Sequence, residues 1–302
     1  MNTYYIGTEH TTLDEIEQVI ESGCEIALSD TAIKNIEHCR RYLDEKMKNR
    51  EKPIYGITTG FGSLCNTSVS EDELEQLQEN LIKSHSCGMG DEVEQRIVRL
   101  MMLLKVKNMS YGISGVCVST AQRLVDFYNK GITPVVYQLG SLGASGDLAP
   151  LAHITLAMLG MGEVYYKGEK RNSADVLAEL DMEPLRLKSK EGLALINGTQ
   201  FMLSHAIDAL LRGRKILKNA DIIATMSLEG FNGLADPFTE NLHTIRPHKG
   251  QIKTAQNIRG YLAGSELQKQ KKVWVQDPYS FRWVPQVHGA SKDAWTYVAS
   301  VI

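Results

Sequence analysis

The stretch that decides the fold is TQFMLSHAIDALLRGRKILKNADIIATMSL, which runs from Thr199 to Leu228. It contains no proline and only one glycine, Gly213. Its apolar residues are spread more widely than one surface stripe: Leu203, Ala206, Ile207, Leu210, Leu211, Leu217, Ile222, Ile223 and Met226. A helix with such a broad apolar surface is usually central to a helical bundle. The stretch therefore predicts one long helix with neighbours on several sides.

Shorter helices are predicted on the amino-terminal side of this stretch. Thr12 followed by Glu15 forms a capping-box pattern, and Gly23 is placed to end the helix that follows. The other expected helices are one capped by Asp30, one opened by Ser70 with Glu73 and one over Gln122–Asn129. The apolar segment Val98–Val106 is expected to lie in the core.

Strand-like segments are few and short, the best being Val135–Leu139 and Val164–Tyr166. We therefore predict a mainly α fold. It consists of an amino-terminal lobe over residues 1–195 and the beginning of an elongated central helical bundle over residues 196–302.

The composition is that of an ordinary soluble globular protein: 43% of the 302 residues are hydrophobic, 23% are charged, and the net charge is -3. No basic stripe indicates nucleic acid, and no apolar run is long enough to cross a membrane. The five cysteines form no CxxC pair, which argues against a disulfide framework or structural zinc. No cluster has the spacing of metal ligands. With no signal peptide visible, we expect a cytoplasmic protein that binds no metal.

Two glycine-rich segments interrupt the helical pattern, Tyr55–Gly62 and Gly140–Asp147. Loops of this composition adopt backbone conformations that other residues avoid, and they often carry function. The second loop is not GxSxG, because the final glycine is absent, and neither loop is a phosphate-binding GxxxxGK[ST]. By itself, the second loop predicts a tight turn with Asp147 at the amino end of a helix that begins near Leu148.

The longer string GASGDLAPLAH, residues 143–153, closely resembles the signature of the histidine and phenylalanine ammonia-lyase family. In that family the Ala-Ser-Gly tripeptide cyclises into a methylidene-imidazolone (MIO) ring, which is an electrophile. The resemblance implies that Ala144, Ser145 and Gly146 form this group without a metal or a diffusible cofactor. It also implies that Asp147 assists the proton transfers. Glycine suits the third position because its nitrogen is the least hindered nucleophile available.

Other segments resemble the same family. Tyr55–Gly62 is similar to its tyrosine loop, which implies that Tyr55 removes the β-proton of the substrate. Asn197, in LINGT, matches the asparagine that contacts the substrate and the MIO. The plainer alternatives are a half-buried loop tyrosine and a helix-capping asparagine.

A further matching block is QDPYSFR, residues 276–282. The resemblance implies that Arg282 binds the substrate carboxylate through two parallel hydrogen bonds, which the guanidinium geometry suits. Gln276 and Tyr279 would line the same site. The alternative is a surface turn around Pro278. The family-like segments around Arg246 and Pro285 are assigned to structure, and His153, His205 and His288 are interpreted as scaffold histidines.

The expected substrate follows from Ser84 and His85, because family members that act on histidine resemble this pair. His85 can exchange a hydrogen bond with an imidazole, while Ser84 leaves space. The alternative is a histidine that merely ends a helix. The resemblance thus implies conversion of L-histidine to trans-urocanate and ammonia. Tyrosine or phenylalanine ammonia-lyase activity and an MIO-dependent aminomutase remain alternatives.

The resemblance covers nearly the whole chain, but family chains are considerably longer. The additional part holds a glutamate for the imidazole, an aromatic that shields the MIO, and much of the bundle that forms a homotetramer. We therefore expect the 302-residue chain alone to be weakly active or inactive. An alternative of another class is a non-enzymatic helical fragment that serves only in assembly, with its tripeptide unmodified.

Overall fold

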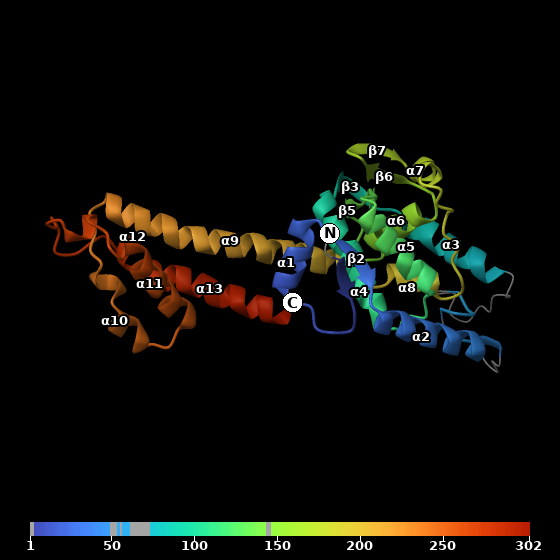
Figure 1. Cartoon of the computed structure of the whole chain (residues 1–302), viewed down its shortest axis with the longest axis horizontal. Helices are drawn as coiled ribbons and strands as arrows, with labels where there is room; N and C mark the ends of the chain where they lie inside the picture. Colours follow the sequence, from blue (N-terminus) through green and yellow to red (C-terminus); the bar gives the residue numbers. More distant parts are fainter. Residues whose placement is uncertain (1–2, 49–52, 55, 61–72, 143–145) are drawn as a thin grey trace. The chain divides into compact units, whose positions relative to one another are not determined.

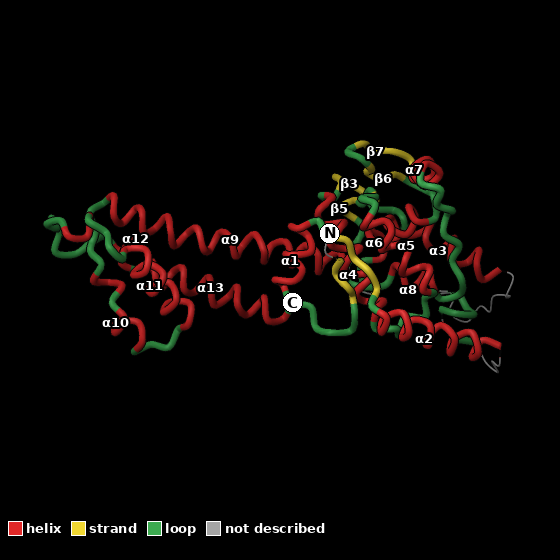
Figure 2. Tube along the Cα trace, in the orientation of Figure 1, coloured by secondary structure: helices red, strands yellow, loops and turns green. Residues whose placement is uncertain are grey.

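The computed structural model of the chain describes residues 3–48, 53–54, 56–60, 73–142 and 146–302, and it is mainly helical, as predicted (Figures 1 and 2). The chain divides into two compact units, Met1–His205 and Ala206–Ile302. The division falls inside the long helix α9 (Gln200–Gly230), which spans almost the whole of the stretch expected to be helical. The assignment of residues 1–195 and 196–302 to separate functional domains stays a prediction.

Helix α4 (Gln95–Ser110) of unit 1 is largely buried. Buried side chains lie on all sides of α4, as expected for the apolar run that contains Val98–Val106. Helices α2 (Asp30–Lys48) and α5 (Val118–Asn129) pack against α4. The other helices of unit 1, besides the start of α9, are α1 (Leu13–Ser22), α3 (Leu74–His85), α6 (Leu148–Met158), α7 (Ser173–Glu179) and α8 (Glu191–Ile196).

Some of the predicted helix boundaries are confirmed, although α5 begins at Val118 and not at Gln122. Thr12 and Glu15 form the reciprocal capping box, and Gly23 caps the carboxyl end of α1. The prediction for Asp30 is wrong in detail, because the Ser29 hydroxyl accepts the hydrogen bond from the Ala32 amide and Asp30 lies in the first turn. Ser70 lies outside the described residues.

Three small sheets complete unit 1. Strands β1 (Thr3–Ile6) and β2 (Glu25–Leu28) pair in parallel, and β3 (Met89–Glu92) and β5 (Tyr137–Leu139) pair antiparallel. The third sheet has the order β4 (Thr133–Pro134), β6 (Glu163–Tyr166), β7 (Glu169–Asn172), with antiparallel pairs. The two predicted strand segments therefore coincide with β5 and β6, although Val135 and Val136 belong to no strand.

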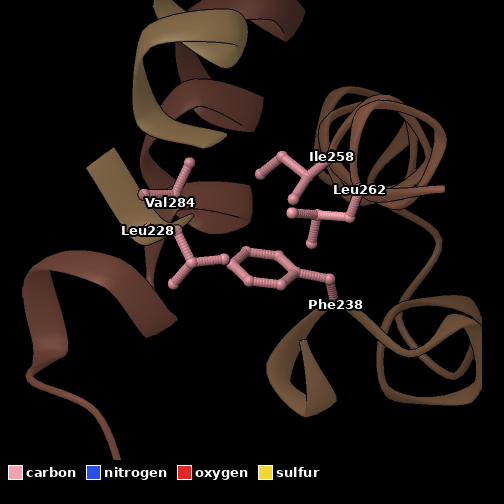
Figure 3. Close-up of a cluster of buried hydrophobic side chains, with 5 residues drawn as sticks. All are labelled: Leu228, Phe238, Ile258, Leu262 and Val284. Atoms are coloured by element: carbon pink, nitrogen blue, oxygen red, sulfur yellow. The ribbon is translucent and has the colours of Figure 1, made fainter. Parts of the chain in front are cut away.

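Unit 2 contains the rest of α9, then α10 (Glu240–Thr244), α11 (Lys249–Leu262), α12 (Tyr279–Arg282) and α13 (Val284–Val301). Two short 3-10 turns, Asp236–Phe238 and Leu267–Lys269, lie between them. Figure 3 shows the core of this unit, in which apolar side chains from α9, α11, α13 and the 3-10 turn Asp236–Phe238 meet. The members of that cluster are Leu228, Phe238, Ile258, Leu262 and Val284.

A buried carboxylate joins three helices of unit 2. Asp221 on α9 is fully buried, and it accepts hydrogen bonds from Lys292 at 2.7 and 2.8 Å and from His288 at 2.9 Å, both on α13. Asn257 on α11 donates a further hydrogen bond at 2.8 Å. With several donors the buried charge is compensated, and the network sets the register of α9, α11 and α13.

Candidate active site

Asp147 links two loops of unit 1. Its side chain is buried, and the carboxylate accepts hydrogen bonds from the Ser141 hydroxyl at 2.7 Å and from the Met202 amide at 3.0 Å. Its own amide donates to the carbonyl of Gly198 at 2.5 Å. Asp147 is the N-cap residue of α6, which begins at Leu148 as the plainer interpretation expected, but its side chain makes no capping hydrogen bond to that helix. Asp147 instead satisfies an amide in the first turn of α9.

Gly146 occupies a position that only glycine fits. Its φ is +99°, and a Cβ atom placed there would lie 2.4 Å from the carbonyl oxygen of Gly198. Such a conformation and such a contact both exclude a side chain. Ala144 and Ser145, the other two residues of the predicted cofactor, lie outside the described residues, as does Tyr55.

Asn197 lies immediately after α8, with its side chain exposed. Its carbonyl oxygen accepts a hydrogen bond at 3.1 Å from the amine of Lys105, which is 1% exposed in the middle of α4. Burial lowers the pKa of Lys105 to about 7. Our sequence reasoning missed Lys105. The signal was a charged residue inside the otherwise apolar run Val98–Val106.

The segment that leads to Asn197 is held by further buried polar groups. The carboxylate of Glu191 accepts hydrogen bonds from the Cys117 amide, the Thr120 hydroxyl and the Lys188 amide at 2.6 to 2.8 Å. The side-chain oxygen of Gln78 accepts from the Gly192 amide at 2.9 Å. These contacts fix the first turn of α8 and thereby the position of Asn197 directly after the helix.

His85 is the last residue of α3, as the plainer interpretation expected. This position is also compatible with a role in substrate binding. Its Nδ1 atom lies 2.8 Å from the carbonyl oxygen of Leu81. Because a carbonyl only accepts, Nδ1 carries the proton in this contact, and in the neutral ring Nε2 is then a hydrogen-bond acceptor. Helix α3 packs against both α6 and α8, which are next to Asp147 and Asn197, and α6 and α8 also pack together.

The third group of candidate residues lies in unit 2. The ring of Tyr279 stacks against the guanidinium of Arg282, with 4.6 Å between the ring centre and the guanidinium carbon. Arg282 donates from Nε to the carbonyl of Asp277 at 2.8 Å. When the Gln276 amide is oriented with its oxygen toward Arg282, that oxygen accepts from Nη2 at 2.8 Å.

The three residues Gln276, Tyr279 and Arg282 are therefore adjacent in the structure. Gln276 and Arg282 line a cavity of about 490 Å³, to which His243, Arg246 and Trp283 also contribute. Since Gln276 occupies the terminal nitrogens of Arg282, a carboxylate that binds through two hydrogen bonds would have to replace this amide oxygen.

The other histidines make structural contacts. Nε2 of His153 accepts a hydrogen bond from the Gly88 amide at 3.0 Å, and burial lowers its pKa. His288 is bonded to Asp221, and His205 lies edge-on to Phe201. Within the described residues, no group of three His, Cys, Asp or Glu side chains is arranged to hold a metal ion. No helix in the described ranges has the length and apolarity needed to cross a membrane.

Comparison with known proteins gives consistent results. The profile of the family described as "Aromatic amino acid lyase" matches residues 11–302. A histidine ammonia-lyase of Natranaerobius thermophilus is 44% identical over 97% of this chain, which spans 58% of that relative's length.

Two solved structures have a similar fold. Histidine ammonia-lyase from Trypanosoma cruzi is 36% identical with a TM-score of 0.88, and the match covers 99% of this chain and 56% of that one. Tyrosine aminomutase from Streptomyces globisporus is 32% identical with a TM-score of 0.91, covering 99% of this chain and 60% of that one.

Proposed function

The chain belongs to the aromatic amino acid lyase family, and from this premise we propose that the protein eliminates ammonia from L-histidine to give trans-urocanate. The supporting observation is the geometry at the end of the Ala-Ser-Gly tripeptide. Gly146 is in a conformation and a contact that exclude any other residue, and the next residue, Asp147, is held by hydrogen bonds from both sides. Both features fit a tripeptide that must cyclise.

The proposed cyclisation uses only atoms of this chain. The nitrogen of Gly146 bonds to the carbonyl carbon of Ala144, and the oxygen leaves as water when a double bond forms to the nitrogen of Ser145. Ser145 then loses its hydroxyl and its α-proton as a second water. The resulting MIO supplies an electrophile for the amine of the substrate, which makes ammonia a better leaving group.

The contacts of Asp147, Asn197 and Arg282 support the roles that we propose for them, whereas Tyr55 lies outside the described residues. Asp147 has a carboxylate next to the tripeptide and would relay protons during cyclisation. Asn197 presents an exposed side chain that would contact the substrate, and Tyr55 would remove the β-proton. Arg282, oriented by Gln276 and Tyr279, would bind the carboxylate.

The mass of the purified protein tests the cofactor. We expect the intact mass to be lower than the value from the sequence by two water molecules, and borohydride to quench a near-ultraviolet absorbance. Addition of L-histidine to the full-length protein should release ammonia and urocanate. An intact mass equal to the sequence value in active protein would rule out the cofactor, and with it the proposed chemistry.

The histidine preference is supported by His85, whose Nε2 atom is left as an acceptor for a substrate imidazole. It is also supported by the relatives named histidine ammonia-lyase. Replacing His85 by Leu should lower kcat/KM for histidine by about 10- to 100-fold, because one hydrogen bond to the imidazole is lost. Activity on phenylalanine should change much less.

The matched control is His38→Leu, which removes an exposed histidine from α2 and should leave all three substrates unaffected. Wild-type kinetics on histidine, tyrosine and phenylalanine should be measured in parallel. A preference of the wild-type protein for phenylalanine would overturn the histidine assignment while leaving the lyase chemistry intact.

An aminomutase is the second candidate, because the fold superimposes on that of a tyrosine aminomutase with a TM-score of 0.91. Product analysis separates the two reactions. A lyase yields free ammonia and an acrylate-type acid, whereas an aminomutase yields a β-amino acid. We also propose that the protein is a cytoplasmic homotetramer, and light scattering of the purified protein would test the tetrameric state.

A further inference from the structure

Lys105 is a buried amine in an otherwise apolar helix. Its side chain is 1% exposed, and its neighbours in sequence, Leu104 and Val106, are buried as well. Burying an amine costs several kcal/mol unless hydrogen bonds compensate for the lost water. Burial accordingly lowers the pKa of Lys105 to about 7. Since an apolar residue would stabilise this part of the core better, the lysine needs another explanation.

The partner of Lys105 indicates that explanation. Its Nζ atom donates to the carbonyl of Asn197 at 3.1 Å. The next carbonyl along the chain, that of Gly198, accepts from the amide of Asp147 at 2.5 Å. The same Gly198 oxygen lies where a side chain on Gly146 would have to be. The two-residue segment Asn197–Gly198 is thus held by α4 at the Asn197 carbonyl and contacts Gly146 and Asp147 at the Gly198 carbonyl.

Other buried polar groups do not duplicate this contact. Glu191 and Gln78 hold the first turn of α8, several residues before Asn197. Among the described residues, Lys105 is the side chain that bonds to the carbonyl at the carboxyl end of α8, where a donor is favourable because the last helical carbonyls lack partners.

We infer that Lys105 is a positioning residue, which holds the Asn197–Gly198 segment against Gly146 and Asp147 in the geometry that cyclisation requires. The inference rests on the proposed function, since it concerns formation of the proposed MIO. The nitrogen of Gly146 must meet the carbonyl carbon of Ala144, and a displacement of about 1 Å in such a step can cost about 100-fold in rate.

Replacement of Lys105 by Met in the full-length protein tests this inference. Methionine has a similar shape but no donor, so the variant should unfold at the same or a higher temperature than the wild type. The rate of two-water loss after synthesis should nevertheless fall by about 10- to 100-fold, as followed by intact mass. Cyclisation should therefore slow while the unfolding temperature does not fall. If Lys105 only stabilised the fold, its replacement would not slow cyclisation without also lowering the unfolding temperature.

Lys107→Met is the matched control, because Lys107 lies on the same helix and donates to carbonyls of Gly7 and Glu9 in the amino-terminal segment. It should cyclise at the wild-type rate. Lys105→Arg, which keeps a donor, should recover most of the cyclisation that Lys105→Met loses.

The outcomes are distinguishable. If the wild-type protein shows no loss of water, the proposed function fails, and this inference fails with it. If the wild type cyclises and Lys105→Met does so at the rate of Lys107→Met, only the role of Lys105 is wrong. Should Lys105→Met not fold, Lys105→Gln replaces it, because its amide is too short to restore the contact. Cyclisation of Lys105→Gln at the rate of Lys105→Arg would then overturn the inference.

Discussion

At the scale of single residues, the most demanding position is Gly146. Its backbone has a φ of +99°, and the Gly198 oxygen occupies the space where a Cβ atom would be. Two requirements therefore apply to Gly146: its φ is one that other residues rarely adopt, and the backbone of the Asn197–Gly198 segment leaves no space for a side chain. Both requirements apply to the residue whose nitrogen forms the new bond in the proposed cyclisation.

Replacing Gly146 by Ala should destabilise the protein by at least about 1–3 kcal/mol, the cost of an unfavourable φ, and should abolish the loss of two waters. The control is Gly168→Ala, at a hairpin position with a φ of +83° and no atom within 4 Å of the added Cβ. That variant should be destabilised by the unfavourable φ but should cyclise normally. Thermal unfolding and intact mass measure the two effects, and normal cyclisation in Gly146→Ala would contradict the proposed chemistry.

At the scale of elements, helices α11 and α13 approach each other so closely that their backbones touch. A Cβ atom on Gly289 would lie 2.4 Å from the amide nitrogen of Gln251, and one on Gly250 would lie 2.2 Å from the carbonyl oxygen of Gly289. Nearby, Lys292 donates to both Asp221 on α9 and Thr254 on α11. The close approach and this buried network together define how the three helices pack.

Gly289→Ala should therefore destabilise unit 2 by about 1–3 kcal/mol, because α11 and α13 must move apart to accept a methyl group. Gly260→Ala is the control within α11, since nothing lies within 4 Å of its added Cβ. That substitution should stabilise the protein by up to about 1 kcal/mol through helix propensity. Chemical denaturation monitored by circular dichroism would measure the free energy of unfolding of both variants. Equal changes in the two variants would contradict the close contact between α11 and α13.

At the scale of the whole molecule, the candidate residues are divided between the two compact units. His85, Asp147 and Asn197 belong to unit 1, and Gln276, Tyr279 and Arg282 belong to unit 2. The chain also spans only 58% of the length of the Natranaerobius thermophilus relative.

We expect the 302-residue chain to release ammonia from histidine at least about 100-fold more slowly than the Natranaerobius thermophilus relative, of whose length it spans 58%. Coupled assays of ammonia and urocanate at equal protein concentration would measure this. A rate comparable to that of a full-length lyase would show that the described residues suffice.

The sequence by itself determined the helical character, the long helix from about Thr199 to Leu228, and the family. These depend on local patterns: apolar spacing, capping residues and contiguous motifs such as GASGDLAPLAH. Helix caps that depend on a neighbouring hydroxyl, such as Ser29 in place of Asp30, were harder to predict, because adjacent polar residues compete for the same amides.

Only the tertiary structure decided which partners meet across the chain. The carboxylate of Asp147 bonds to the first turn of α9 and not to its own helix, and the amine of Lys105 reaches a carbonyl 92 residues away. The exclusion of any side chain at Gly146 likewise depends on Gly198. Such contacts arise from the packing of distant segments, and local sequence patterns do not encode them because the energy of each contact is realised only when the helices are assembled.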